Sequence, residues 1–274
     1  MPSENSPEKF SARAHVLSEA NYAQLKVLAP NVAVLPWGAT EAHNFHLPFG
    51  TDNIQATALG EAAVARANAS GARCVLLPTM PFGIDHAQLD QISTITMRAS
   101  TQRLVLLDVA ESLVRQNIGR LVVLNFHGGN EFKPLLRDVM LDFPIFCIQV
   151  HAHQLAPETK TQILQNAGDH ADEFETSLVL HLAPHWVAPL ETAGDGATTQ
   201  SVLPALTSTP GVWCSRDWKA LTQDTGAGDP RQATKEKGAL LFEALVNELT
   251  PVLIELSAAK NGEFPFVLKT EREA

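Results

Sequence analysis

The chain has 274 residues, of which 45% are hydrophobic and 18% charged, so it is long enough to bury a substantial core. Its formal net charge is -10, with 20 Lys and Arg against 30 Asp and Glu, and this field would repel nucleic acids and anionic membrane surfaces. We therefore expect a small-molecule partner, with no nucleic acid and no membrane.

The N-terminal residues and the cysteines indicate in which cellular compartment the protein is expected. Residues 1–16 lack the apolar centre of a signal peptide, and no later apolar run is long enough to span a bilayer. Cys74, Cys147 and Cys214 are odd in number and far apart, which excludes a disulfide framework and a zinc ribbon. We expect a cytoplasmic protein that forms one domain over residues 1–274, with frayed ends at 1–15 and 260–274.

Short apolar segments alternate with amphipathic ones along the chain. Segments rich in Val, Ile, Leu and Phe predict strands at 31–36, 72–77, 120–126 and 143–150. They lack polar alternation, as strands of a parallel sheet covered on both faces should. Apolar residues at helical spacing predict helices at 53–70, 100–119, 130–143, 173–183 and 231–256. This order predicts an α/β fold, a three-layer α/β/α sandwich with a mostly parallel central sheet.

One segment, 189–218, is rich in Gly, Pro, Ser and Thr and too long for an ordinary connection, so it is either functional or mobile. Its Trp213 and Trp218 are interpreted as core or interface residues, or as part of a substrate lid. Trp37 and Trp186, elsewhere in the chain, are also interpreted as core or interface residues.

Metal-capable side chains gather in two predicted loops. The stretch "GATEAHNFHLPFGTDN" (38–53) follows the first strand and carries Glu41, His43, His46 and Asp52, while "NFHGGNE" puts His127 after a later strand, beside glycines that would let a ligand approach. Open α/β sheets build their sites at the carboxyl ends of their strands. Carboxylates and imidazoles together suit zinc, manganese or iron, although each residue taken singly could be a structural cap.

Other histidines give weaker signals. His86 could reach a substrate from a neighbouring strand end or be structural. His151 and His153 alternate at the end of a predicted strand, so one is expected to face each way. On composition alone "GDHADE" (168–173), which contains His170, is a solvated polar turn before a helix.

Three segments, 38–53, 125–131 and "GDHADEFETS" (168–177), resemble the signature segments of the creatininase (creatinine amidohydrolase) family. Weaker similarities, "PFGIDHAQ" (81–88) and "GAGDPRQATKEKG" (226–238), extend the resemblance over about residues 30 to 245. It implies an α/β/α sandwich, a hexamer, and a divalent-metal centre that hydrolyses non-peptide C–N bonds, often in small cyclic amides or formamides.

The resemblance also implies roles for single residues. Glu41, Asp52 and His127 would surround one metal, with Asp52 bridging to a second metal held by His43. Glu175 would complete that second site, with Glu173 as the alternative, because Gly129 stands where creatininase has an acidic residue. His170 would be the catalytic proton shuttle between metal-activated water and the leaving nitrogen, and Asp169 would orient it or contact substrate.

We therefore expect a hydrolase with two ions of zinc or manganese per chain, iron being the alternative. Within enzymes the competing hypothesis is a mononuclear deformylase or a lactonase at the same centre. A silent metal-binding scaffold is the alternative outside enzymes, and a phosphate cradle at "HGGN" lacks the accompanying Lys. Asn44 and Phe45 replace the usual Gly-Pro, and Asp172 replaces a usual Gly, which predicts a pocket unlike that of creatininase. His46 is expected to be structural or to contact a ligand.

Overall fold

The computed structural model describes residues 12–166 and 168–260, and in them the predicted parallel sheet forms. Its strands are all parallel, in the order β2-β1-β3-β4. Their bounds are β1 Val32–Trp37, β2 Cys74–Leu76, β3 Arg120–Asn125 and β4 Phe146–His151. The predicted α/β fold is therefore confirmed.

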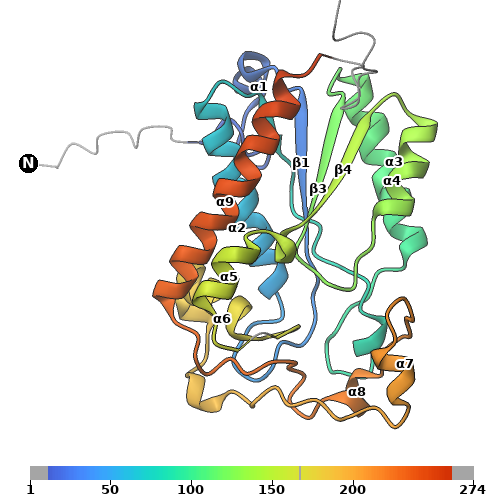
Figure 1. Ribbon diagram of the computed structural model, residues 1–274. Helices are drawn as coiled ribbons and strands as arrows, with labels where there is room; N and C mark the ends of the chain where they lie inside the picture. Colours follow the sequence, from blue (N-terminus) through green and yellow to red (C-terminus); the bar gives the residue numbers. More distant parts are fainter. Residues whose placement is uncertain (1–11, 167, 261–274) are drawn as a thin grey trace, which may run out of the picture.

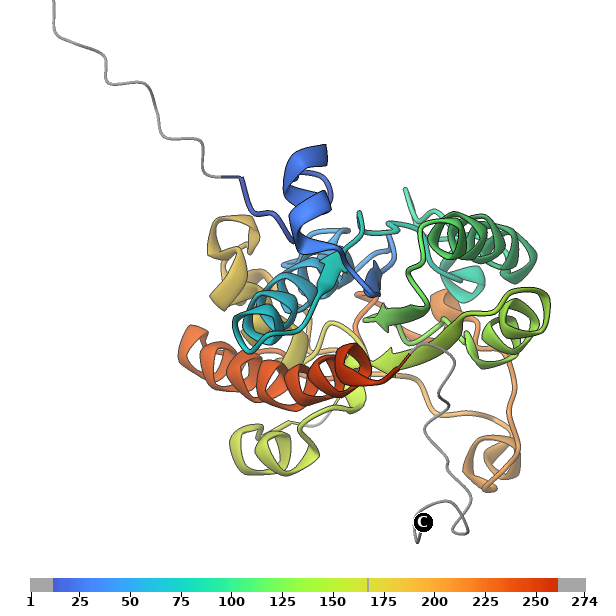
Figure 2. The same cartoon turned by 90° about the horizontal axis from the view of Figure 1, so that it is seen from above.

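Helices cover both faces of this sheet. In Figure 1, α2 and α9 lie on one side of the strands and α3 and α4 on the other, and Figure 2 shows the same three layers from above. Among the described residues, no helix combines the length and apolar character that a membrane span requires. The α-helices are α1 Tyr22–Leu28, α2 Thr51–Ala69, α3 Ala99–Arg115, α4 Lys133–Asp142, α5 Pro157–Ile163, α6 Glu173–Leu182, α7 Pro204–Ser208, α8 Trp218–Leu221 and α9 Lys235–Ala258.

The strands divide their side chains between two cores. In β1, Val32 and Val34 join the cluster formed with α2 and α9, whereas Ala33, Leu35 and Trp37 join the cluster formed with α3 and α4. All these side chains are buried. Because successive residues of a strand face opposite sides, a sheet with two buried faces needs continuous apolar runs, and this is why the strands show no polar alternation.

Two strands differ from their predicted bounds at a proline. β2 ends at Leu76, although the Leu77 N–H still donates a hydrogen bond to the carbonyl oxygen of Val34, and Pro78 follows. β4 starts only at Phe146, since Phe143 still caps α4 and Pro144 follows it. The predicted strand 72–77 was too long at both ends, and the predicted strand 143–150 was too long at its start, where Pro144 lies.

The chain ends predicted to fray lie mostly outside the described residues, which begin at residue 12 and end at residue 260. Within the described part, Arg13 forms an ion pair with Glu61 of α2 at 2.7 Å.

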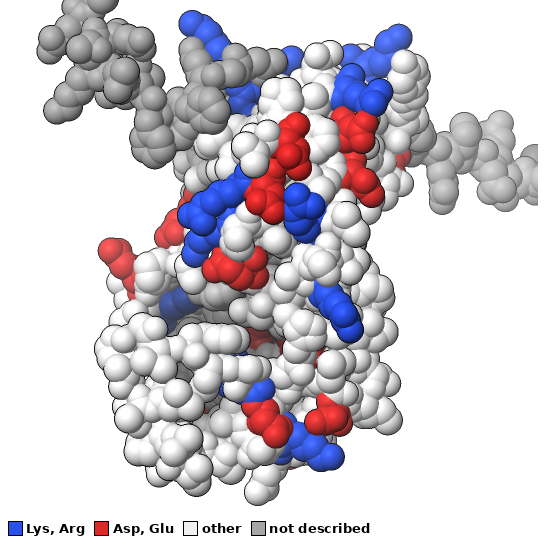
Figure 3. Space-filling view, turned by 90° about the vertical axis from the view of Figure 1, so that its right-hand side faces the viewer, with Lys and Arg blue, Asp and Glu red and all other residues white. Residues whose placement is uncertain are grey.

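The register of the sheet brings the site loops together. Trp37 at the end of β1 pairs with Asn125 at the end of β3, which pairs with His151 at the end of β4. The loops that follow therefore leave the same edge of the sheet. This edge is at the bottom of Figure 1, and Figure 3 shows a hollow on the adjoining side of the molecule.

The contact between α6 and α9 depends on Gly238. A Cβ added there would lie 1.9 Å from the carbonyl oxygen of Ser177, a backbone atom of α6. We expect Gly238→Ala to lower the free energy of unfolding by about 1 to 3 kcal/mol, as overpacking usually does, although Ala is the better helix former. Urea denaturation measures the free energy of unfolding of the wild type and the variant. Gly50→Ala, whose Cβ would meet nothing closer than 4.0 Å, is the control; equal stability of both variants would contradict the prediction.

Candidate metal centre

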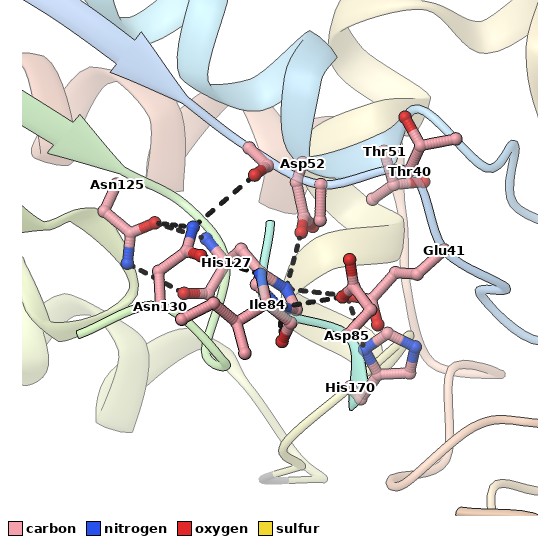
Figure 4. Close-up of polar contacts among 12 residues, drawn as sticks. Thr40, Glu41, Thr51, Asp52, Ile84, Asp85, Asn125, His127, Asn130 and His170 are labelled. Carbon is pink, nitrogen blue, oxygen red and sulfur yellow. Dashed lines mark hydrogen bonds and ion pairs between the residues drawn. The ribbon is translucent and has the colours of Figure 1, made fainter. Parts of the chain in front are cut away.

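The site lies where several loops meet at the carboxyl edge of the sheet (Figure 4). Glu41 comes from the loop after β1, and Asp52 from the first turn of α2. His127 follows β3, and Glu175 lies in the first turn of α6. The N-terminus of a helix stabilises a nearby negative charge. The first turns of α2 and α6 therefore favour the charged carboxylates of Asp52 and Glu175.

His127 has a defined tautomer. Its Nε2 is 3.1 Å from the carbonyl oxygen of Ile84, which can only accept a hydrogen bond, so Nε2 carries the proton. In the neutral ring Nδ1 is then an unprotonated acceptor. It lies 2.8 Å from Glu41 Oε1 and 3.1 Å from Asp52 Oδ2. Three acceptors so close repel one another unless a cation, a proton or a metal ion, lies between them.

His43 repeats this arrangement on the other side of Asp52. Its Nδ1 is 3.1 Å from the carbonyl oxygen of Glu41, which leaves Nε2 as the acceptor. That Nε2 lies 3.1 Å from Asp52 Oδ1 and 3.9 Å from Glu175 Oε2. The two oxygens of Asp52 thus face two different histidines. Both sets, Glu41 with Asp52 and His127, and His43 with Asp52 and Glu175, have donor atoms within 4.8 Å of one another.

The electrostatics of the metal-free cluster are strongly perturbed. Burial raises the pKa of Glu41 to about 7 and that of Glu175 to about 8. Burial opposes a charge on His43, but Asp52 outweighs it and raises the pKa of His43 to about 10. Buried oxygen and nitrogen donors that compete for protons in this way are the donor set of zinc, manganese or iron, so the residues fit a divalent metal.

His170 lies beside this cluster with a free acceptor. Its Nε2 is 2.8 Å from the carbonyl oxygen of Ala42 and therefore carries the proton, and its Nδ1 lies 3.8 Å from Glu41 Oε1. Burial and nearby His43 hold the pKa of His170 well below its ordinary value. The ring contacts His43 and meets Trp218 edge-on, with centroids 4.1 and 5.3 Å away. Glu41, His43 and His170 form a third set of possible metal donors.

The structure separates the two candidate glutamates. Glu173 is buried but points away from the cluster: it forms an ion pair with Lys237 and accepts hydrogen bonds from the backbone of Gln165 and Asn166, at 2.9 and 2.7 Å. Glu175 lies in a donor set and is mostly buried.

In the described part of the chain, the carboxylate of Asp169 forms no hydrogen bond or ion pair with the ring of His170. This carboxylate is exposed and forms an ion pair with Arg216, at the rim of the cavity that contains the cluster. The expectation that Asp169 orients the catalytic ring is therefore not met by this geometry. The carboxylate remains within the lining of the cavity.

The structure also shows the positions of the remaining candidate histidines. His46 is buried with Nε2 2.8 Å from Thr176 Oγ1, next to Glu175, and His86 is exposed. His151 and His153 do not face opposite ways: their ring centroids are 5.1 Å apart. The interpretation as alternating strand residues was wrong because β4 ends at His151 and the chain turns into a short 3-10 helix.

Sequence reasoning missed Asp85 and Gln88. Both are buried three residues apart, beside exposed His86, and Gln88 donates a hydrogen bond to Glu41. Asp85 Oδ1 lies 2.9 Å from His127 Nε2 and can fix the orientation of that ring. The signal was the spacing of three, which puts two side chains on one face of a helical turn.

Gly129 has another role than the one expected. A Cβ there would lie 2.3 Å from the carbonyl oxygen of Ile84, so the missing side chain lets the loop after β2 press against His127. Gly128 has open space around it and lines the cavity. Asn44, where the family usually has Gly, adopts the left-handed φ of 55° that Asn tolerates.

The cavity has a volume of about 480 Å³. Asp172, the predicted departure from the family pattern, lines it and caps α6. Trp218 is buried in its wall, Trp37 is buried in the core, and Trp186 and Trp213 are exposed.

Comparison with known proteins decides the family. The family model Creatininase, described as creatinine amidohydrolase, matches residues 17–253. This protein belongs to the creatininase family. The family match, together with relatives whose names describe hydrolases, identifies this chain as an amidohydrolase, as the sequence predicted.

Several relatives align over nearly the whole chain. A mycofactocin precursor peptide peptidase of Mycobacterium ulcerans (strain Agy99) is 28% identical, over 92% of this chain and 97% of its own. A crystal structure of a provisionally assigned creatinine amidohydrolase from Bacteroides fragilis NCTC 9343 is 33% identical, with a TM-score of 0.84, over 91% of this chain and 99% of that one. A structure named creatininase Mn has a TM-score of 0.75 at 19% identity, over 90% of this chain and 100% of its own, and shares the fold.

Proposed function

We propose that this creatininase-family enzyme hydrolyses an amide C–N bond at a centre of two divalent metal ions. The observation that carries the proposal is Asp52, whose Oδ1 and Oδ2 lie 3.1 Å from His43 and 3.1 Å from His127 respectively. A carboxylate with one histidine at each oxygen is suited to bridge two ions. Glu41 would complete the first site and Glu175 the second.

The protein's own residues then have distinct tasks. Two bound ions would supply an activated water and polarise the substrate carbonyl. His170, neutral and with Nδ1 free, takes the proton that this water loses and gives it to the departing nitrogen as the C–N bond breaks and the new C–O bond forms. Trp218 walls the site beside His170, and Gln88 holds Glu41 in place.

The favoured substrate is a small, often cyclic, amide with a non-peptide C–N bond. Zinc or manganese is the proposed metal, since solved creatininases are named with each, and iron is the alternative. The same centre could serve a mononuclear deformylase or a lactonase, which need the same activated water.

A peptide bond is a second candidate substrate. Relatives named mycofactocin precursor peptide peptidase align over 92% and 85% of this chain, the second of them from Mycobacterium tuberculosis. A cavity of about 480 Å³ is also larger than a single small ring requires. Hydrolysis next to the end of a peptide would use the same residues.

The test is a substrate panel on protein of known metal content. Purified protein loaded with zinc or manganese is offered lactams, formamides, short peptides, guanidines and lactones, and the hydrolysis products are identified by mass spectrometry. Turnover of lactams or formamides alone supports the first candidate, and turnover of peptides alone supports the second. A metal-loaded protein inactive on every member would favour the silent scaffold.

We further propose a homo-oligomer, a hexamer, as the resemblance implies. The segment 196–215 contains no charged residue, and Val202 and Trp213 on it are 92% and 85% exposed. Figure 3 shows a largely uncharged surface at the lower left of this side of the molecule. Such surface is typical of subunit contacts.

Light scattering at micromolar concentration should therefore report an assembly several times the 29.6 kDa chain mass. Trp213→Asp, which puts a charge into that surface, should shift the assembly toward smaller species. Leu141→Asp, at an 84% exposed position on α4, is the control. A monomeric wild-type protein would refute the proposal.

A further inference from the structure

We propose that the ammonium group of Lys160 binds a carboxylate of the substrate, so that the enzyme acts on amides that carry a free carboxylate. This inference rests on the proposed amide hydrolysis and names a class of substrate for it. Both candidate substrates, a cyclic amide and a peptide, can carry such a group.

Lys160 belongs to the wall of the catalytic cavity. It lies on α5, and it lines the same cavity as Glu41, Asp52 and His127. Its Nζ donates a hydrogen bond to the carbonyl oxygen of His153 and lies 4.0 Å from the centroid of the Phe174 ring. These two contacts hold the amine at the wall instead of letting it extend into solvent.

Among the described residues, no carboxylate oxygen lies within the 4.0 Å of Lys160 Nζ that a direct ion pair requires. The carboxylates of Asp172, Glu248 and Glu175 lie farther away and only partly offset its charge. The other cation of the cavity, Arg216, is paired with Asp169, and Lys237 is paired with Glu173. Burial lowers the pKa of Lys160 to about 8. An ammonium has three donors, and a carbonyl and an aromatic face do not neutralise it, so a carboxylate would be its natural partner.

The surroundings favour one carboxylate over a phosphate. The cavity wall also contains the acidic Asp172, which is buried and caps α6. A phosphate dianion would meet a single unpaired cation close to that acid. A carboxylate, with one negative charge, matches the one unpaired ammonium group.

The test uses pairs of acids that differ in one carboxylate. Glutarate is compared with pentanoate, and adipate with hexanoate, because both members can place one carboxylate at the metals and only the diacid has a second. Their dissociation constants are measured by calorimetry on metal-loaded wild type, K160M and K160R. K219M removes a positive charge from an exposed residue of α8 that does not line the cavity, and is the matched control.

In the wild type, at least one diacid should bind roughly ten- to a hundredfold more tightly than its monoacid, the usual effect of a charge-assisted hydrogen bond. K160M should abolish this advantage, whereas K160R and K219M should keep most of it. If circular dichroism shows that K160M does not fold, K160Q takes its place. No advantage in the wild type, or an advantage that persists in K160M, overturns the inference.

Turnover separates this inference from the proposed function. N-formylglycine and N-formylglycinamide are compared, as are trialanine and its carboxy-terminal amide. The acid of a pair should have the lower KM in the wild type, and this difference should vanish in K160M. If neither member of any pair is hydrolysed, the amide-hydrolysis proposal fails for these classes, while the binding of the diacids still decides the role of Lys160.

Discussion

Asp52→Ala should remove both metal ions and lower kcat/KM by at least about a thousandfold, because bound metal contributes several kcal/mol to charge stabilisation in the transition state. Asp52 is the only residue shared by the donor set that contains His127 and the set that contains Glu175. Loss of one ligand that serves both ions should therefore empty both sites. Elemental analysis should fall from about two ions per chain to near zero.

The control for Asp52 is Asp169→Asn, which removes an exposed carboxylate at the cavity rim that belongs to none of the donor sets. Its metal content should equal that of the wild type. Circular dichroism checks that Asp52→Ala is folded. Because Asp52 is buried against His43 and His127, its loss can destabilise the chain, and Asp52→Asn, which keeps the size of the side chain, takes its place if Asp52→Ala does not fold. Full metal content in Asp52→Ala would remove the bridging role. Loss of a single ion would assign Asp52 to one site only.

The fold was predictable because its signals are local. Each strand of a sheet buried on both faces must be apolar along its length. A segment such as 31–36 can therefore be recognised as a strand from its own residues, without knowing which segments pack against it. The errors in the strands were confined to their ends, whereas the short helices α1, α5, α7 and α8 were not predicted. Proline alone does not mark a strand end, because Pro36 lies inside β1.

Glu41, His43 and Asp52 were also recognisable from sequence, because one loop between a strand and a helix brings them together. The choice between Glu173 and Glu175 was not, since both lie in the first turn of α6. Two positions apart on a helix, at about 100° per residue, they point to nearly opposite sides. Which side faces the cluster depends on α9, whose Lys237 pairs with Glu173.

Residues that reach the site through tertiary packing carried little or no sequence signal. Lys160 comes from a short helix that follows β4, and its place in the cavity depends on contacts with His153 and Phe174. Gln88 reaches Glu41 because Gly129 allows the loop after β2 to approach His127 closely. Neither position is special in composition, so only the folded chain reveals them.

His170→Asn should lower kcat by roughly a hundredfold to ten-thousandfold, the usual contribution of a general acid–base group, and leave folding and metal content nearly unchanged. The side chain of Asn is close to imidazole in polarity and can still donate a hydrogen bond to the carbonyl oxygen of Ala42, as His170 does. Asn offers no basic ring nitrogen that could take up a proton from the water. Substrate binding should survive, so KM should change little.

Metal stoichiometry measured on His170→Asn distinguishes the proton-shuttle role from two alternatives, a metal ligand and a ring that only fills space. Glu41, His43 and His170 also form a set of possible donors, so if His170 is a ligand, His170→Asn should lose metal together with activity. If the ring only fills space beside Trp218, neither quantity should change. His86→Asn, at an exposed position, is the control and should match the wild type. Because Nδ1 of His170 is the atom that would bind either a proton or a metal ion, only the loss of turnover with metal retained identifies it as the proton shuttle.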